Sequence, residues 1–148
     1  MKVLIISHNP LSAQNNMGKT FLSLFSCFSR EELCQLYIYP SLPDGDWCNG
    51  FYRVTDKEIL KSYLNFSKPG GVLHPDQIGQ SVGQYENPED QSLYKNRKNK
   101  SALRRLLRDA MWRFSTWDNR QLQAWLDKEQ PNCIFVAQVL PSLPMILH

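Results

Sequence analysis

The chain has 148 residues, of which 42% are hydrophobic and 21% charged, and its formal net charge is +3. A chain of this length can bury about two thirds of the surface that its unfolded form exposes, so we expect one folded domain and not a disordered chain. No apolar run approaches the roughly 20 residues that span a bilayer, and the apolar start is too short for a signal peptide. The four cysteines form no C-x-x-C pair, so we expect a cytoplasmic chain with reduced thiols and no metal.

The charges are unevenly distributed along the chain. The stretch from Lys95 to Arg113 holds eight basic residues and one acidic residue, a balance of +7. The remaining nine basic and thirteen acidic residues give −4. This basic element either binds an anionic partner or is the solvated face of a helix, and the pattern alone leaves both open.

The first elements predict an α/β sheet. Lys2–Ser7 (KVLIIS) is short, apolar and rich in β-branched residues, which predicts a strand buried on both faces. Apolar residues recur at helical spacing over Gly18–Phe28, and Cys34–Tyr39 (CQLYIY) predicts a second strand. A helix that crosses over between two strands implies that the strands are parallel neighbours.

The middle of the chain first continues the order of strands and helices and then shows little periodicity. Phe51–Val54 predicts a third strand, and Thr55 with Glu58 has the T-x-x-E form of a capping box that opens a helix through about Leu64. The next 33 residues, Ser67–Asn99, contain two adjacent glycines, three prolines and little periodicity. That stretch is long for a loop in a compact domain, so we expect a mobile excursion at 67–99.

The last third predicts two helices and a strand. The helices cover Ser101–Phe114 and about Asp118–Glu129, and the apolar run Cys133–Val139 (CIFVAQV) predicts a buried strand. Pro141–Leu147 has the pattern of a first helical turn. We therefore expect residues 1–148 to form a single, partial Rossmann-like domain, a parallel sheet flanked by helices that is truncated within its last helix.

The loop after the first strand loosely matches a phosphate-binding loop. In Ala13–Thr20 (AQNNMGKT), Gly18, Lys19 and Thr20 occupy the last three positions of that motif. Five extra residues separate the match from the strand, and the predicted strand Cys133–Val139 carries Gln138 where an acidic residue would hold magnesium.

Two weaker interpretations of this loop remain open. A helix that begins near Gly18 directs its amide groups toward the carboxyl end of the first strand, where phosphate is favoured and where His8 could face the same crevice. Alternatively, Asn15 or Asn16 caps the helix and Gly18 only relieves crowding.

Both ends of the chain resemble one family. Met1–Phe28, with its KVLIIS strand, small-residue loop and first helix, resembles the opening of the N-terminal domain of GT-B glycosyltransferases, especially family 4 types from bacterial surface polysaccharide clusters. Trp125–Val136 (WLDKEQPNCIFV) is similar to a later helix and strand of that domain, and Pro141-Ser142-Leu143 to the start of the following helix. The resemblance is thin from about Gly45 to Asn99.

The resemblance implies an acceptor-binding half of a glycosyltransferase, which faces a second half that binds the nucleotide-sugar co-substrate; it implies no other cofactor. The paired glycines of the family's first loop are Asn16-Met17-Gly18 here, so among them only Gly18 carries over. Ala137 and Gln138 stand where many relatives have a histidine, and we carry over no catalytic base. The chain alone is then expected to be inactive. The alternative function is a non-catalytic nucleotide- or phosphate-binding module that uses Gly18, Lys19 and Thr20 of the Ala13–Thr20 loop. The candidate substrate- or phosphate-binding residues of the chain are Asn16, Gly18, Lys19, Thr20 and His8.

The predicted helix Ser101–Phe114 is amphipathic. Arg104, Arg105 and Arg108 lie mostly opposite a leucine-rich stripe, and Trp112 lies toward the basic side. This pattern suits a helix at an anionic membrane surface, and the resemblance implies lipid-linked acceptors there, at the inner face of the membrane. Packing of the stripe on the sheet explains the pattern equally well. Binding of nucleic acid is a weaker alternative, since no known module accompanies the arginines.

Overall fold

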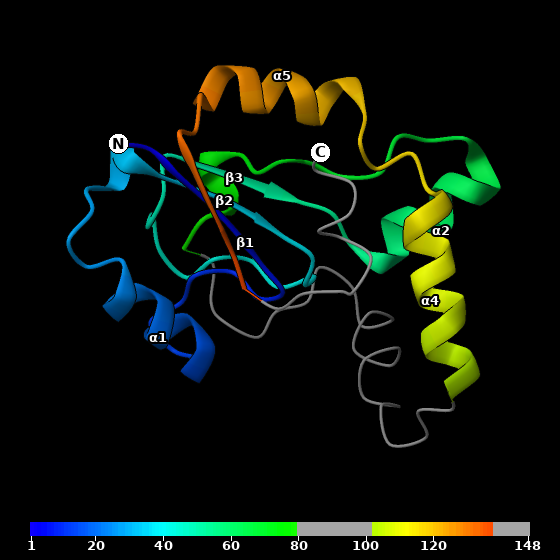
Figure 1. Ribbon diagram of the computed structural model, residues 1–148, viewed down its shortest axis with the longest axis horizontal. Coiled ribbons are helices and arrows are strands. Elements are labelled where there is room, and N and C mark those ends of the chain that lie inside the picture. The colour runs from blue at the N-terminus through cyan, green and yellow to red at the C-terminus, as the bar shows by residue number, and fades with distance from the viewer. Residues whose placement is uncertain (80–101, 138–148) are drawn as a thin grey trace.

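The computed structural model describes residues 1–79 and 102–137, and the side chains of the second part from residue 106 onward. It is an α/β structure with one five-stranded sheet flanked by helices (Figure 1). Its elements, in chain order, are β1 (Val3–Ser7), α1 (Asn16–Leu24), η1 (Arg30–Glu32), β2 (Leu33–Tyr37), β3 (Gly50–Arg53), α2 (Asp56–Asn65), β4 (Gly71–Val72), η2 (Pro75–Gln77), α4 (Ala102–Phe114), α5 (Arg120–Glu129) and β5 (Cys133–Val136).

The sheet is mostly parallel and has the order β4-β3-β2-β1-β5. β1 pairs in parallel with both β2 and β5, β2 pairs in parallel with β3, and only β4 is antiparallel. The predicted α/β class and the predicted parallel pair of first strands are therefore confirmed. Because β2 and β3 lie on one side of β1 and β5 on the other, the connections diverge at the carboxyl end of β1.

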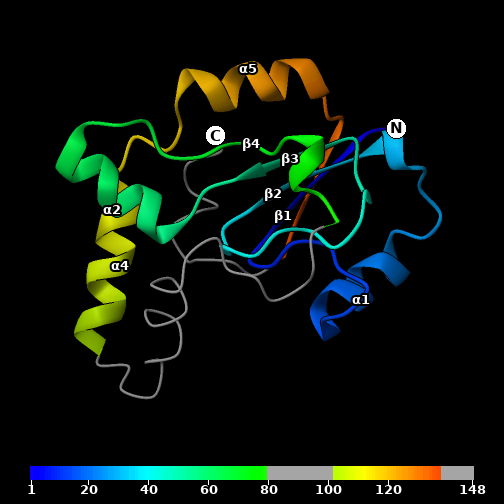
Figure 2. The ribbon, with the colours of Figure 1, turned by 180° about the vertical axis from the view of Figure 1, so that it is seen from behind.

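The central strands β1, β2 and β3 are covered on both faces of the sheet. Successive residues of β1 point to opposite faces, so Leu4 and Ile6 belong to one core and Val3 and Ile5 to the other. The first core is completed by α2, α4 and α5, whose indoles and aliphatic side chains are buried, and the second by Phe21 and Phe25 of α1 together with the 38–49 connection. Figures 1 and 2 show α5 along one side of the sheet and α1 along the other.

Local capping chemistry sets the starts of the helices. Glu58 and Thr55 form both hydrogen bonds of the capping box, as the sequence predicts. α1 begins at Asn16, two residues before the predicted Gly18, because the side chain of Asn15 accepts a hydrogen bond from the Gly18 amide. Asn119 caps α5 in the same manner.

Residues 67–99, predicted to be a mobile excursion, begin with residues that belong to the sheet. Gly71–Val72 forms β4 on the edge of β3, and the left-handed Gly70 precedes it with φ +87°. A side chain at Gly70 would collide with Val54. Residues 80–99 of the expected excursion lie outside the described residues, as do Gln138 and the helix expected at Pro141–Leu147.

In the part of the chain that the structure describes, no helix combines the length and the apolar character needed to cross a bilayer.

Candidate functional site at the carboxyl edge of the sheet

A buried glutamine fixes the loop that follows β1. Gln35 lies on β2 beside β1 and is fully buried. Its Nε2 donates to Ser7 Oγ at 2.7 Å and to the Asn9 carbonyl at 3.1 Å, while its Oε1 accepts from the Leu11 amide at 2.9 Å. These three bonds satisfy the buried amide and hold the loop at the carboxyl edge of the sheet. We did not identify Gln35 from the sequence, although a glutamine inside the apolar run CQLYIY is its signal.

A second set of polar contacts folds the loop into the start of α1. Ser12 Oγ accepts from the amides of Gln14 (3.1 Å) and Asn15 (3.3 Å) and donates to Asp44 Oδ2 at 2.7 Å. A Cβ at Gly18 would lie 2.5 Å from the Ser12 carbonyl oxygen, so only glycine allows this approach. The interpretation of Asn15 as the cap and of Gly18 as the residue that relieves crowding is confirmed.

The other residues of the loose phosphate motif point to solvent. Asn16, Lys19 and Thr20 are exposed, and the Thr20 hydroxyl donates to the Asn16 carbonyl at 3.0 Å. The amides of Leu11, Gln14, Asn15 and Gly18, which a phosphate loop would aim at its ligand, bond to side chains of the protein. The Asp44 carboxylate beside Ser12 also disfavours an anion there. The geometry thus favours a capped helix over a phosphate loop.

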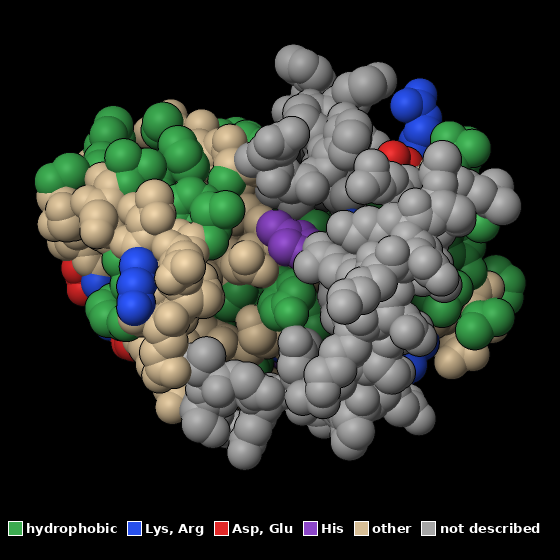
Figure 3. Space-filling view, turned by 90° about the horizontal axis from the view of Figure 1, so that it is seen from below, with side chains coloured by type: hydrophobic (Ala, Val, Ile, Leu, Met, Phe, Trp, Pro, Cys, Tyr) green, Lys and Arg blue, Asp and Glu red, His purple; other side chains and the backbone are tan. Residues whose placement is uncertain are grey.

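His8 lies at the end of β1 and faces the segment that follows β2. Its ring centroid is 5.5 Å from that of Tyr39, with the rings tilted by 59°, and its carbonyl accepts from the Ile38 amide at 3.4 Å. The structure therefore brings His8 to the same sheet edge as the start of α1. Figure 3 shows this side of the molecule, where the described surface is mostly hydrophobic and uncharged polar.

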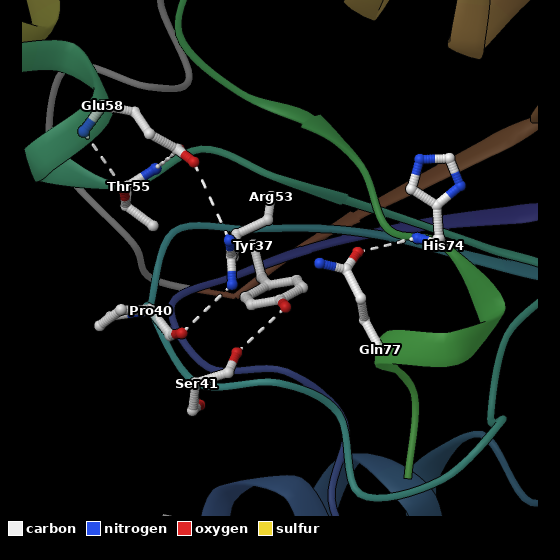
Figure 4. A network of polar contacts seen from close by, with 8 residues as sticks. All are labelled: Tyr37, Pro40, Ser41, Arg53, Thr55, Glu58, His74 and Gln77. Atoms are coloured by element: carbon white, nitrogen blue, oxygen red, sulfur yellow. Dashed lines mark hydrogen bonds and ion pairs between the residues drawn. The ribbon is translucent and has the colours of Figure 1, made fainter. Parts of the chain in front are cut away.

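Arg53 places a positive charge at the end of β3. Its side chain is 8% exposed, Nη1 donates to the Pro40 carbonyl at 3.3 Å, and Nη2 lies 4.0 Å from Glu58 Oε1. Beside it, the Tyr37 hydroxyl donates to the Ser41 carbonyl at 3.1 Å (Figure 4). Through these partners the buried guanidinium joins the end of β3 to the segment after β2 and to the first turn of α2. We did not identify Arg53 from the sequence; its signal is a charged residue that ends an apolar strand.

The basic helix is oriented differently from the prediction. Trp112, expected on the membrane-facing basic side, is 1% exposed and packs against Trp117 with ring centroids 6.2 Å apart. That expectation is wrong because this large indole fills the core while its N–H reaches a partner, Asp56, which also pairs with Arg108 at 2.9 Å. The side chains of Arg104 and Arg105 lie outside the described part.

The apolar stripe of α4 also differs from the expected one. Leu106, Leu107 and Phe114 are exposed and do not pack on the sheet. Met111 of the same stripe does pack against the core.

Two of the four cysteines are buried within the sheet and the segment that follows β2. Burial raises the pKa of the Cys34 thiol to about 12 and also raises that of Cys48, so both stay protonated and poorly nucleophilic. Cys27 and Cys133 are exposed free thiols. Within residues 1–79 and 102–137 no group of histidine, cysteine or acidic side chains is arranged to hold a metal ion.

Comparison with known proteins gives no match to a family model, to a curated protein or to a solved structure.

Proposed function

We propose that the chain is the acceptor-side part of a glycosyltransferase of the GT-B type, with a Rossmann-like sheet. The observation that carries this proposal is the strand order around β1. β2 and β3 lie on one side of β1 and β5 lies on the other, and Gln35 fixes the loop that follows β1 at this point. Open parallel sheets bind ligands at the carboxyl edge where the strand order reverses. The sequence resemblance of Met1–Phe28 to the family's first strand, loop and helix supports the same assignment.

In this proposal the chain supplies one wall of the active site. His8 and Tyr39 present aromatic faces and polar atoms that suit a sugar ring, and Arg53 lies at the end of the neighbouring strand. The acceptor would be a glycan, including a lipid-linked one at the inner face of the membrane. The nucleotide-sugar donor of the hexosyl group would bind to a separate half, which also stabilises the departing diphosphate. We assign no catalytic base.

The experiment is a titration of the isotope-labelled chain followed by NMR. Oligosaccharide acceptors should shift the amide signals of residues 7–12 and 37–41, whereas nucleotide sugars alone should leave them unchanged. His8→Ala and Tyr39→Ala should each weaken acceptor binding by about tenfold, the effect of losing one aromatic contact. Ser23→Ala, an exposed change on α1 outside the candidate binding residues, is the matched control. Sugar transfer by the isolated chain would contradict the idea that it is only one wall.

A non-catalytic phosphate-binding module is the second candidate, because Lys19 and Thr20 are exposed in the first turns of α1 at the same edge. Magnesium-dependent binding of ATP or GTP that is lost in Lys19→Ala would favour it. The bonded loop amides and Asp44 make us expect no such binding.

A further inference from the structure

A group of large apolar side chains is exposed on α2 and α4. On α2 and its C-terminal cap they are Leu60, Tyr63, Leu64 and Phe66, with Leu64 72% and Phe66 94% exposed. Phe66 ends the helix in the left-handed region, with φ 51°, where glycine or asparagine is the usual residue. A contiguous exposed apolar surface of this kind usually marks a site that binds a partner or a membrane.

The exposed side of α2 mixes apolar and basic residues. Lys57, Leu60, Lys61 and Leu64 follow the spacing i, i+3, i+4 and i+7 and share one side of the helix. The opposite side carries the buried Ile59. The outer side of α2 therefore carries leucines among its lysines, whereas the outer side of a solvated helix is usually polar.

α4 extends this surface. Leu107 and Phe114 lie on one side of α4 by their spacing of seven residues, and they are 61% and 74% exposed. The Tyr63 hydroxyl donates to the Met111 carbonyl at 2.7 Å, so α4 borders the Tyr63 side of α2. The two helices lie side by side in Figures 1 and 2.

We propose that these residues form a docking surface for an anionic lipid bilayer. We call it the α2–α4 face: Leu60, Lys61, Tyr63, Leu64, Phe66, Leu107 and Phe114. Leucine and aromatic side chains would enter the boundary between headgroups and acyl chains, while the lysine remains at the level of the anionic headgroups. A second copy of the chain suits the face less well, because a two-fold contact would bring its lysine close to its own copy. This proposal is independent of the glycosyltransferase assignment.

The test measures retention of the full chain on vesicles of phosphatidylcholine alone and of phosphatidylcholine with phosphatidylglycerol. We expect retention at low salt only on the anionic vesicles. The double variant Leu64→Gln/Phe66→Asn should lower the partition coefficient by at least about tenfold, because each of these side chains would lose its apolar burial. Asparagine tolerates the left-handed conformation of residue 66, so this variant should fold.

Two further variants separate the causes. Met17→Gln/Leu24→Gln removes two exposed apolar residues of α1 and should bind vesicles like the unchanged chain. Lys61→Gln should weaken retention and its dependence on salt. The proposal is overturned if the chain is not retained on anionic vesicles, or if the α1 variant loses as much retention as the α2 variant. Concentration-dependent dimerisation in sedimentation that Leu64→Gln/Phe66→Asn abolishes would also overturn it, in favour of a second copy.

Discussion

The indole nitrogen of Trp112 donates a hydrogen bond of 2.7 Å to the Oδ1 atom of Asp56, in the first turn of α2. The same carboxylate accepts from Arg108 Nε, at 3.1 Å to Oδ1 and 2.9 Å to Oδ2. One side chain therefore joins two helices whose contacting residues are 52 and 56 positions apart in the sequence. It also lies at a helix N-terminus, where negative charge is favoured.

Asp56→Ala should lower the free energy of unfolding by about 2 to 4 kcal/mol, because it leaves the Trp112 indole N–H buried without its acceptor and Arg108 without its carboxylate. Asp56→Asn keeps an acceptor for Trp112 and should cost less. Urea unfolding measures both. Asp127→Ala, an exposed change on α5, is the control; equal losses for Asp56→Ala and Asp127→Ala would contradict the linking role.

A buried carboxylate clamps the amino edge of the sheet. Glu129 is 3% exposed, pairs with the Lys2 ammonium group and accepts from Asn49 Nδ2 at 2.7 Å. Lys2→Met should therefore destabilise the fold by about 3 kcal/mol, since it leaves a buried charge without its cation. The double variant Lys2→Met/Glu129→Gln should recover part of this loss in the same unfolding assay. If the losses of the single variants Lys2→Met and Glu129→Gln add up to the loss of the double variant, the pair is not coupled.

Gly18→Ala should destabilise the fold by about 1 to 3 kcal/mol, because its Cβ would press on the Ser12 backbone. Lys19→Ala, one residue further along and exposed, should change the stability by no more than about 0.5 kcal/mol. Thermal unfolding of the two variants measures the contrast. If Gly18→Ala is neutral, the close approach of α1 to the loop is not a constraint.

Alkaline pH should lower the free energy of unfolding gradually. Burial raises the pKa of Tyr52 from 10.0 to about 12, so the folded state holds this proton more tightly than the unfolded state does. Its contribution is complete below about pH 10 and is lost as pH rises toward about 12, amounting to about 2 to 3 kcal/mol. Cys34 adds a similar loss that begins near pH 9.

Tyr52→Phe removes the ionisable hydroxyl and should flatten the fall in stability above about pH 10 while leaving the Cys34 loss in place. Urea unfolding at a series of pH values measures it. An unchanged slope above pH 10 would mean that Tyr52 does not titrate late in the folded chain.

The parts of the fold that local chemistry decides could be predicted from the sequence. The capping box at Thr55 and Glu58 and the apolar strand runs depend on residues a few positions apart, and the structure reproduces them. The prediction that the last run is buried is wrong, because β5 pairs with β1 alone and leaves Ile134 and Val136 exposed. The orientation of α4 depends on Asp56, far away in the chain, so periodicity alone placed Trp112 on the wrong side. For the same reason the sequence predicted His8 and the start of α1 at the sheet edge but not Gln35 or Arg53, which neighbouring strands bring there.

The position of β1 has a consequence for folding during synthesis. β1 is made before both of its neighbours, and the later one, β5, begins at Cys133, which pairs with Val3 across 130 residues. Until β5 has emerged from the ribosome, the edge of β1 that β5 will cover is open. An open strand edge of that kind is a template for aggregation. Closing the sheet is therefore a late, non-local and slow step, and the nascent chain is at its most vulnerable before the step is complete.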